Sequence, residues 1–206
     1  MVIHRARIGL LLSLLLLLGA CSDPPPQLRP LSASDIVVAF GDSLTYGTGS
    51  SADDSYPAQL GRSIGYPIVR SGVPGERTPQ GLQRLQQILE QHQPRLLLLC
   101  HGGNDILTHS PDSAIKANLA RMIELAQSRG SEVVLIGVPK FGLMLSPAPL
   151  YAELAEEYQL PYLADSISEI LADPALKSDR VHPNAEGYRH IASDMETLLR
   201  ESGAIN

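Results

Sequence analysis

Apolar and polar positions form alternating blocks along most of the chain, and the blocks have the lengths of strands and helices. Five short apolar runs predict buried strands, over residues 36–40, 67–70, 96–100, 133–138 and 162–163. Between them apolar residues recur at helical spacing, and the predicted helices begin near Tyr56, Thr78, Ser110, Leu150 and Asn184. This alternation predicts the α/β class, as a three-layer α/β/α sandwich around a five-stranded parallel sheet.

The first 21 residues have the three parts of a secretory signal. Arg5 and Arg7 precede an almost unbroken apolar run over 8–18, and small residues lead to Cys21. The run is shorter than the about 20 apolar residues that a membrane-spanning helix needs. The stretch resembles a bacterial lipoprotein signal, in which the cysteine carries lipid; an ordinary cleaved signal with an unmodified Cys21 is the alternative. We therefore predict a signal peptide over 1–20 and a lipid-anchored, periplasm-facing protein, and Ser22 favours the outer membrane.

Proline and serine are frequent after Cys21 and predict an extended tether over 21–34. Residues 35–206 are enough for one domain with an ample core. The formal net charge of −6 and the lack of a basic stripe argue against nucleic acid as a partner. Cys100 has no partner if Cys21 carries lipid, and the sequence has neither a zinc-spaced Cys/His cluster nor a glycine-rich phosphate loop. No metal or cofactor is predicted, and the oligomeric state stays undefined.

Three polar clusters follow directly after predicted strands, at residues 41–43, 72–75 and 102–105. The carboxyl ends of parallel strands meet at one edge of a sheet, where ligands bind in open α/β folds. A fourth cluster, 179–182, precedes the last predicted helix. We therefore expect the first three clusters to lie together, with the fourth as a source of a base.

These clusters contain the groups that acyl transfer by a serine requires. Ser43 is the candidate nucleophile and His182 the candidate base, and Asp179, three residues before the histidine, can fold back to its ring N–H. The side-chain amide of Asn104 and the backbone N–H groups of Ser43 and Gly75 can bind the oxyanion. Taken alone, each cluster is better explained as a turn, so the prediction depends on all four occurring in one order within one domain.

Neighbouring polar residues have simpler explanations. Asp42 and Asp105 can cap loop N–H groups, and Cys100 is expected to be buried packing. The sequence assigns no role to His101.

Together the clusters resemble the SGNH hydrolase family, also called GDSL esterases and lipases. The resemblance covers nearly everything after the tether and rests on four ordered blocks: 41–44, Gly75, 102–105 and 179–183. It implies the flavodoxin-like SGNH hydrolase fold, an oxyanion hole of Ser43, Gly75 and Asn104, and a triad completed by Asp179 and His182.

Within this family the chain looks most like the periplasmic multifunctional branch of acyl-CoA thioesterases, arylesterases and lysophospholipases. The stretches that carry this likeness are 81–85, 91–95 and 154–163. Two departures, at 71–74 and in the apolar loop 140–144, concern the choice of substrate more than the chemistry.

These observations predict a membrane-tethered serine esterase that hydrolyses carboxylic esters, such as aryl esters, lysophospholipids or acyl thioesters. The expected partners are a small-molecule or lipid ester and a membrane held through the N-terminal anchor. Phe141, Leu143, Met144 and Leu145 can line an acyl pocket, although an apolar loop can equally pack on the domain. The alternatives are an acetylesterase acting on cell-envelope polysaccharide and a non-catalytic envelope-binding lipoprotein.

Overall fold

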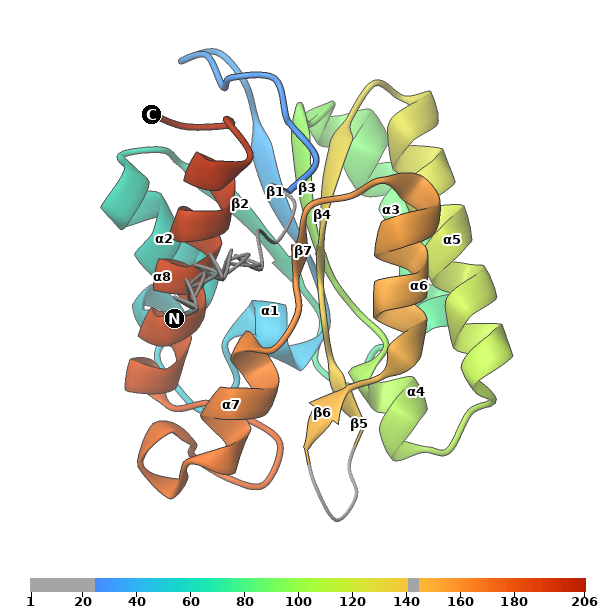
Figure 1. Cartoon of the computed structure of the whole chain (residues 1–206), viewed down its shortest axis with the longest axis vertical. Helices are drawn as coiled ribbons and strands as arrows, with labels where there is room; N and C mark the ends of the chain where they lie inside the picture. The colour runs from blue at the N-terminus through green and yellow to red at the C-terminus, as the bar shows by residue number, and fades with distance from the viewer. Residues whose placement is uncertain (1–24, 141–144) are drawn as a thin grey trace, which may run out of the picture.

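A computed structural model describes residues 25–140 and 145–206, and a five-stranded sheet lies at its centre (Figure 1). The strand order is β2-β1-β3-β4-β7, and each neighbouring pair is parallel. The strands are β1 (Val37–Gly41), β2 (Ile68–Gly72), β3 (Leu96–Cys100), β4 (Glu132–Ile136) and β7 (Tyr162–Leu163). The five-stranded parallel sheet predicted from the apolar runs is therefore confirmed.

Helices cover both faces of this sheet, which confirms the predicted three-layer sandwich (Figure 1). One face carries α2 (Tyr56–Ile64) and α8 (Ala185–Glu201), and the other carries α3 (Thr78–His92), α5 (Asp112–Ser128) and α6 (Pro149–Tyr158). Every residue of the central strands β1 and β3 is buried. Strands covered on both faces need continuous apolar sequence, which is why the run of four leucines in β3 is accommodated.

Several short elements differ from the sequence prediction. The residues after β1, expected to form a loop, form the one-turn helix α1 (Ser43–Tyr46), because the Asp42 carboxylate accepts the Leu44 N–H and caps it. The turn after β3 contains α4 (Gly103–Leu107), and α7 (Ser166–Ala172) was not predicted. The remaining short elements are 3-10 turns η1 (Ala52–Asp54) and η2 (Pro174–Leu176) and the antiparallel pair β5 (Pro139–Lys140) and β6 (Ser146–Pro147).

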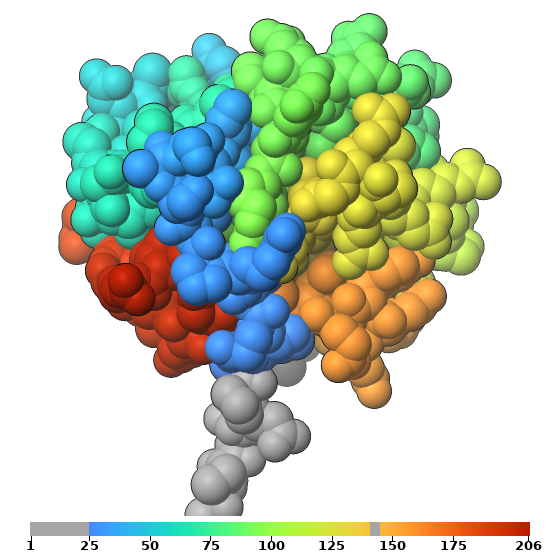
Figure 2. Space-filling model, turned by 90° about the horizontal axis from the view of Figure 1, so that it is seen from above, coloured from blue at the N-terminus to red at the C-terminus, as the bar shows by residue number. Residues whose placement is uncertain are grey.

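The last part of the predicted tether belongs to the folded domain, so the expected boundary at residue 35 is too late. Leu28 is only 9% exposed and packs on the core. The N–H groups of Leu28 and Leu31 donate to the carbonyls of Ser202 and Ala204, at 2.7 and 2.8 Å. Figure 2 shows this end of the molecule, with the N-terminal segment in blue against the C-terminal residues in red.

The predicted signal peptide and Cys21 lie outside the described residues. No helix within 25–140 and 145–206 combines the length and the apolar character that crossing a membrane would require.

Candidate active site

The polar clusters meet at the carboxyl edge of the sheet, at the lower end of Figure 1. Ser43 is the first residue of α1, directly after β1, and Asn104 lies in the first turn of α4, directly after β3. Gly41 lets the two loops approach, since a Cβ at this position would lie 1.9 Å from the Cys100 carbonyl oxygen. The residues that follow β1 and β3 are thereby brought into one site, as the sequence predicted.

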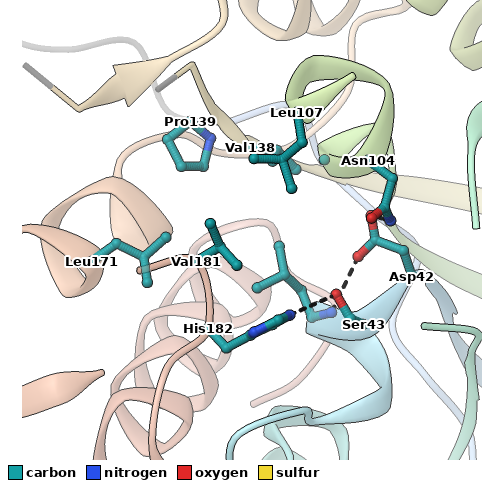
Figure 3. A pocket seen from close by; sticks show the side chains of 11 residues that line it. Asp42, Ser43, Asn104, Leu107, Val138, Pro139, Leu171, Val181 and His182 are labelled. Atoms are coloured by element: carbon teal, nitrogen blue, oxygen red, sulfur yellow. Dashed lines mark hydrogen bonds between the residues drawn. The ribbon is translucent and has the colours of Figure 1, made fainter. Parts of the chain in front are cut away.

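Asp179, His182 and Ser43 form a continuous hydrogen-bonded chain (Figure 3 shows its last link). His182 Nδ1 lies 2.8 Å from Asp179 Oδ2, and His182 Nε2 lies 3.0 Å from Ser43 Oγ. The other oxygen of Asp179 accepts the backbone N–H groups of Val181 and His182, both at 2.8 Å. The turn therefore folds the carboxylate back onto the imidazole, which is the contact that the three-residue spacing predicted.

The charge of Asp179 fixes the tautomer of His182. Burial raises the pKa of this carboxyl, but the hydrogen bonds from the His182 ring and from the backbone outweigh that effect and lower the pKa below its usual value. A carboxylate accepts only, so Nδ1 carries the proton and the lone pair of Nε2 accepts the Ser43 hydroxyl. Ser43 is thus hydrogen-bonded to a nitrogen that can take its proton.

Two of the three predicted oxyanion donors lie in the pocket beside Ser43. Ser43 and Asn104 line it, and Asn104 Nδ2 also donates to the Glu76 carbonyl at 3.0 Å and to Asp42 Oδ2 at 3.3 Å. Gly75 is exposed, has the left-handed φ of 79° that favours glycine, and is not among the residues that line this pocket. Gly75 therefore lies outside the pocket. It precedes Glu76, whose carbonyl accepts the Asn104 amide.

The two aspartates expected to be structural have that role. Buried Asp42 accepts the Leu44 N–H at 3.1 Å, and burial raises the pKa of its carboxyl. Asp105 accepts both the N–H and the hydroxyl of Thr78, each at 2.8 Å, and so joins α4 to the start of α3. Thr78, where a helix was predicted to begin, is the first residue of α3, and Arg77 occupies the cap position.

Apolar side chains line much of the pocket beside Ser43 and His182 (Figure 3). They are Leu44, Leu107, Val138, Pro139, Leu171 and Val181. The sequence prediction had placed an acyl pocket on the loop after β4 instead. Of those residues, Phe141, Leu143 and Met144 lie outside the described residues. Leu145 is packed partly against the core rather than among the pocket residues.

Position in the chain could have identified several of these missed pocket residues. Leu107 lies three positions after Asn104, one helical turn along α4. Val138 follows β4 at the same sheet edge as Ser43, and Val181 stands directly before His182. Leu171 had no such signal, because α7 itself was not predicted.

Comparison with known proteins defines the family. The family described as GDSL-like lipase/acylhydrolase matches residues 39–190. The chain belongs to this family. The matched residues include Ser43, Asn104, Asp179 and His182, so the hydrogen-bonded chain described above lies within the family domain.

Named relatives of this GDSL-family chain include hydrolases. An arylesterase from Vibrio mimicus is 31% identical over 171 residues, which cover 78% of this chain and 86% of that protein. Thioesterase 1/protease 1/lysophospholipase L1 from Escherichia coli (strain K12) is 29% identical over 177 residues, covering 82% and 85%. The crystal structure of TesA has a TM-score of 0.74 at 21% identity, covers 82% of this chain and 99% of that one, and shows the shared fold.

Proposed function

We propose that this GDSL-family enzyme is a serine esterase in which Ser43 is the nucleophile. The observation that carries the proposal is the hydrogen-bonded chain from Asp179 through His182 to Ser43. A non-catalytic binding protein has no need for a serine, a correctly protonated imidazole and an ionised carboxylate in line. The arrangement therefore favours covalent catalysis over binding alone.

The geometry supports a two-step reaction. Ser43 Oγ attacks the ester carbonyl carbon while its proton passes to His182 Nε2, and the carbonyl oxygen becomes an oxyanion held by the Ser43 N–H and the Asn104 amide. Collapse of this intermediate expels the alcohol, which takes the proton from His182. A water then gives its proton to His182 and attacks the acyl carbon. Collapse of this second intermediate breaks the bond to Ser43 Oγ, which takes the proton back from His182, and the acid is released. The longer contact of Asn104, 3.3 Å to Asp42, is the one that the oxyanion replaces.

The main test is hydrolysis of p-nitrophenyl acetate, butyrate, octanoate and palmitate by the chain from Ser22 onward. The Ser43→Ala variant is expected to lose activity by about 1,000-fold or more, since it lacks the attacking oxygen. Turnover that survives this substitution would remove Ser43 from the mechanism. No turnover of any ester would favour the binding lipoprotein instead.

The apolar lining of the pocket beside Ser43 supports an acyl chain as the group bound there. Leu107 is 43% exposed and lines the pocket, whereas Ile36, 39% exposed, lies at the opposite end of β1. Leu107→Ser is expected to lower the octanoate-to-acetate ratio of kcat/KM by roughly 10-fold, because acyl methylenes lose an apolar contact. Ile36→Ser is the matched control and should leave the ratio unchanged. An unaltered ratio in both variants would favour an acetylesterase.

We also propose that lipid on Cys21 anchors the enzyme in the cell envelope, with the domain facing the periplasm. The signal-like sequence before Cys21 supports this location. Residues 28–31 lie at the amino-terminal edge of the sheet, opposite the Ser43 edge, so an anchor just before them would direct the site away from its own membrane. Labelling with radioactive palmitate tests the anchor. The label should appear in the wild-type chain and be lost in Cys21→Ser, and a wild-type chain that takes no label would contradict the proposal.

A further inference from the structure

His101 follows β3 directly and is completely buried. Its Nδ1 accepts the N–H of Gly102 at 2.9 Å, so the ring proton must be on Nε2. That nitrogen lies 3.1 Å from Glu76 Oε2 and donates to it. The imidazole is thereby fixed at both nitrogens, to the backbone of Gly102 on one side and to the loop between β2 and α3 on the other.

Glu76 is held equally firmly by Arg84 of α3. The guanidinium donates to both carboxylate oxygens of Glu76, at 2.8 and 2.6 Å. Burial raises the pKa of Glu76, but hydrogen bonds from His101 and Arg84 outweigh it and lower the pKa to about 2. Glu76 is therefore a carboxylate at neutral pH.

Arg84 also reaches the ends of the two neighbouring strands. It donates to the Gly41 carbonyl at 3.0 Å and to Ser71 Oγ at 2.6 Å, and its guanidinium lies 4.0 Å from the centre of the Phe40 ring. One cation thus joins the end of β1, the end of β2 and the loop that contains Glu76.

Helix α3 contains a glycine that this arrangement requires. A Cβ at Gly81 would lie 2.2 Å from His101 Nε2, so any other residue would displace the imidazole from Glu76. Glycine inside a helix is less favourable than alanine. Gly81 therefore weakens α3 locally but leaves room for the ring of the buried His101.

These contacts connect the three loops that carry the predicted oxyanion donors. Gly41 is two residues before Ser43, Glu76 directly follows Gly75, and His101 is three residues before Asn104. The link to Asn104 is direct, because its amide donates to the Glu76 carbonyl at 3.0 Å.

Building on the esterase function, we propose that His101, Glu76 and Arg84 form a positioning network that holds Asn104 and the loop of Gly75 in register with Ser43. None of the three lines the pocket beside Ser43. Their effect on the reaction is exerted through the placement of the oxyanion donors.

The central experiment compares His101→Leu with His101→Gln. Leucine removes the donor to Glu76, whereas the glutamine amide places a donor near the former Nε2. Loss of one oxyanion donor costs about 100- to 1,000-fold in kcat, so a misplaced donor should cost less. We expect His101→Leu to lower kcat about 10- to 100-fold with KM within about twofold, and His101→Gln to recover most of the loss.

A matched control and a second variant separate positioning from stability. Ser131→Ala removes a buried hydroxyl that donates to the Pro94 carbonyl, away from the site, and should lower thermal stability without changing kcat. Arg84→Lys keeps the charge but loses the simultaneous bonds to Gly41, Ser71 and Glu76, and should lower kcat about 10-fold. It provides the test if His101→Leu does not fold.

The pH profile separates positioning from proton transfer. His101→Gln should keep the wild-type shape of kcat against pH, because His182 remains the base. The network is overturned if the folded His101 and Arg84 variants keep wild-type kcat and lose only stability. That result would leave the esterase function intact, which depends instead on the Ser43→Ala result.

Discussion

His182 and His101 each donate one ring N–H to a carboxylate, but they do so through opposite nitrogens. In the exposed pair, His182 Nδ1 donates to Asp179 and the lone pair of Nε2 faces Ser43 at 3.0 Å. In the buried pair, the lone pair of His101 Nδ1 is occupied by the Gly102 N–H and Nε2 donates to Glu76. Only His182 can accept a proton from a reacting group, although both rings have a carboxylate partner.

The two pairs also differ in their exposure to solvent. The His182 side chain is 17% exposed and Asp179 is half exposed on a turn, so the imidazolium that forms during the reaction is partly solvated. His101 is fully buried and Glu76 is held by Arg84 as well. A charge buried in this way is stabilised only by a fixed set of partners. We infer that the exposed pair transfers protons, whereas the buried pair keeps the neighbouring loops in position.

The substitution with the largest expected effect removes the lone pair of His182 Nε2 that faces Ser43. His182→Gln is expected to lower kcat by about 1,000-fold or more, with a much smaller change in KM, because the base is lost while the pocket remains. His101→Gln, the same substitution in the buried pair, should leave most activity. Steady-state kinetics on p-nitrophenyl butyrate would measure both. Equal losses in the two variants would contradict the distinction.

A second substitution changes the tautomer without removing the ring. Asp179→Asn keeps an oxygen for the N–H groups of Val181 and His182 but presents an amide to Nδ1, which favours the wrong tautomer. We expect kcat to fall about 100- to 10,000-fold. Asp173→Asn is a matched control, since Asp173 is also exposed and accepts a turn N–H, from Ala175 at 2.8 Å. A control that lost as much kcat would indicate a general loop effect.

The buried pair should instead affect how the free energy of unfolding depends on pH. The pKa of Glu76 is about 2 in the folded domain, below its ordinary value of 4.5. The charged form therefore stabilises the fold above pH 4.5, and this contribution is lost as the pH falls from 4.5 to 2. It amounts to at most about 3 kcal/mol, and urea unfolding at a series of pH values would measure it.

Glu76→Gln removes this pH-dependent contribution, so the gap in unfolding free energy between wild type and variant should narrow as the pH falls. The lowered pKa of Asp179 acts in the same direction, but this side chain is half exposed and its contribution should be much smaller. A gap that stays constant from pH 7 to pH 3 would contradict the assignment of a lowered pKa to Glu76.

The strands and the polar clusters of the site could be predicted because each follows a continuous or ordered pattern in the sequence. The strands were recognisable because covered parallel strands need unbroken apolar runs, as in Leu96–Cys100. The site was recognisable because Ser43, Asn104 and His182 lie in clusters that follow strands or precede a helix. Parallel topology alone then brings the clusters after β1 and β3 to one edge.

The elements that were missed depend on single contacts between distant residues. α1 forms because one carboxylate, Asp42, caps a single turn, and no periodicity exists over four residues. The role of His101 depends on Glu76, which lies 25 positions earlier, so neither residue indicates the other locally. The glycine at position 81 was a usable signal, since a glycine within an amphipathic helix needs a packing reason.

The N-terminal segment was misjudged for a related reason, and it supplies the smallest test. Proline-rich composition predicts a tether, yet Leu28 is buried in the core and Leu31 packs against it, at the sheet edge opposite Ser43. Leu28→Ala is expected to lower the unfolding free energy by about 1–2 kcal/mol, less than for a central core leucine because the site is at the periphery. Neither histidine pair contacts this segment, so kcat should not change.

Urea unfolding and kinetics on the same Leu28→Ala preparation would measure both quantities, with Ile36→Ala as a control at an exposed apolar residue of the same edge. Unchanged stability would mean that residues 28–31 are not part of the cooperative fold. A reduced kcat would mean that the amino-terminal edge of the sheet is coupled to the site. Residues 28–31 would then affect catalysis in addition to the two histidine pairs. Stability lost with kcat retained confines the chemistry to the carboxyl edge, where the free lone pair of His182 Nε2 and the occupied lone pair of His101 Nδ1 separate the reacting imidazole from the supporting one.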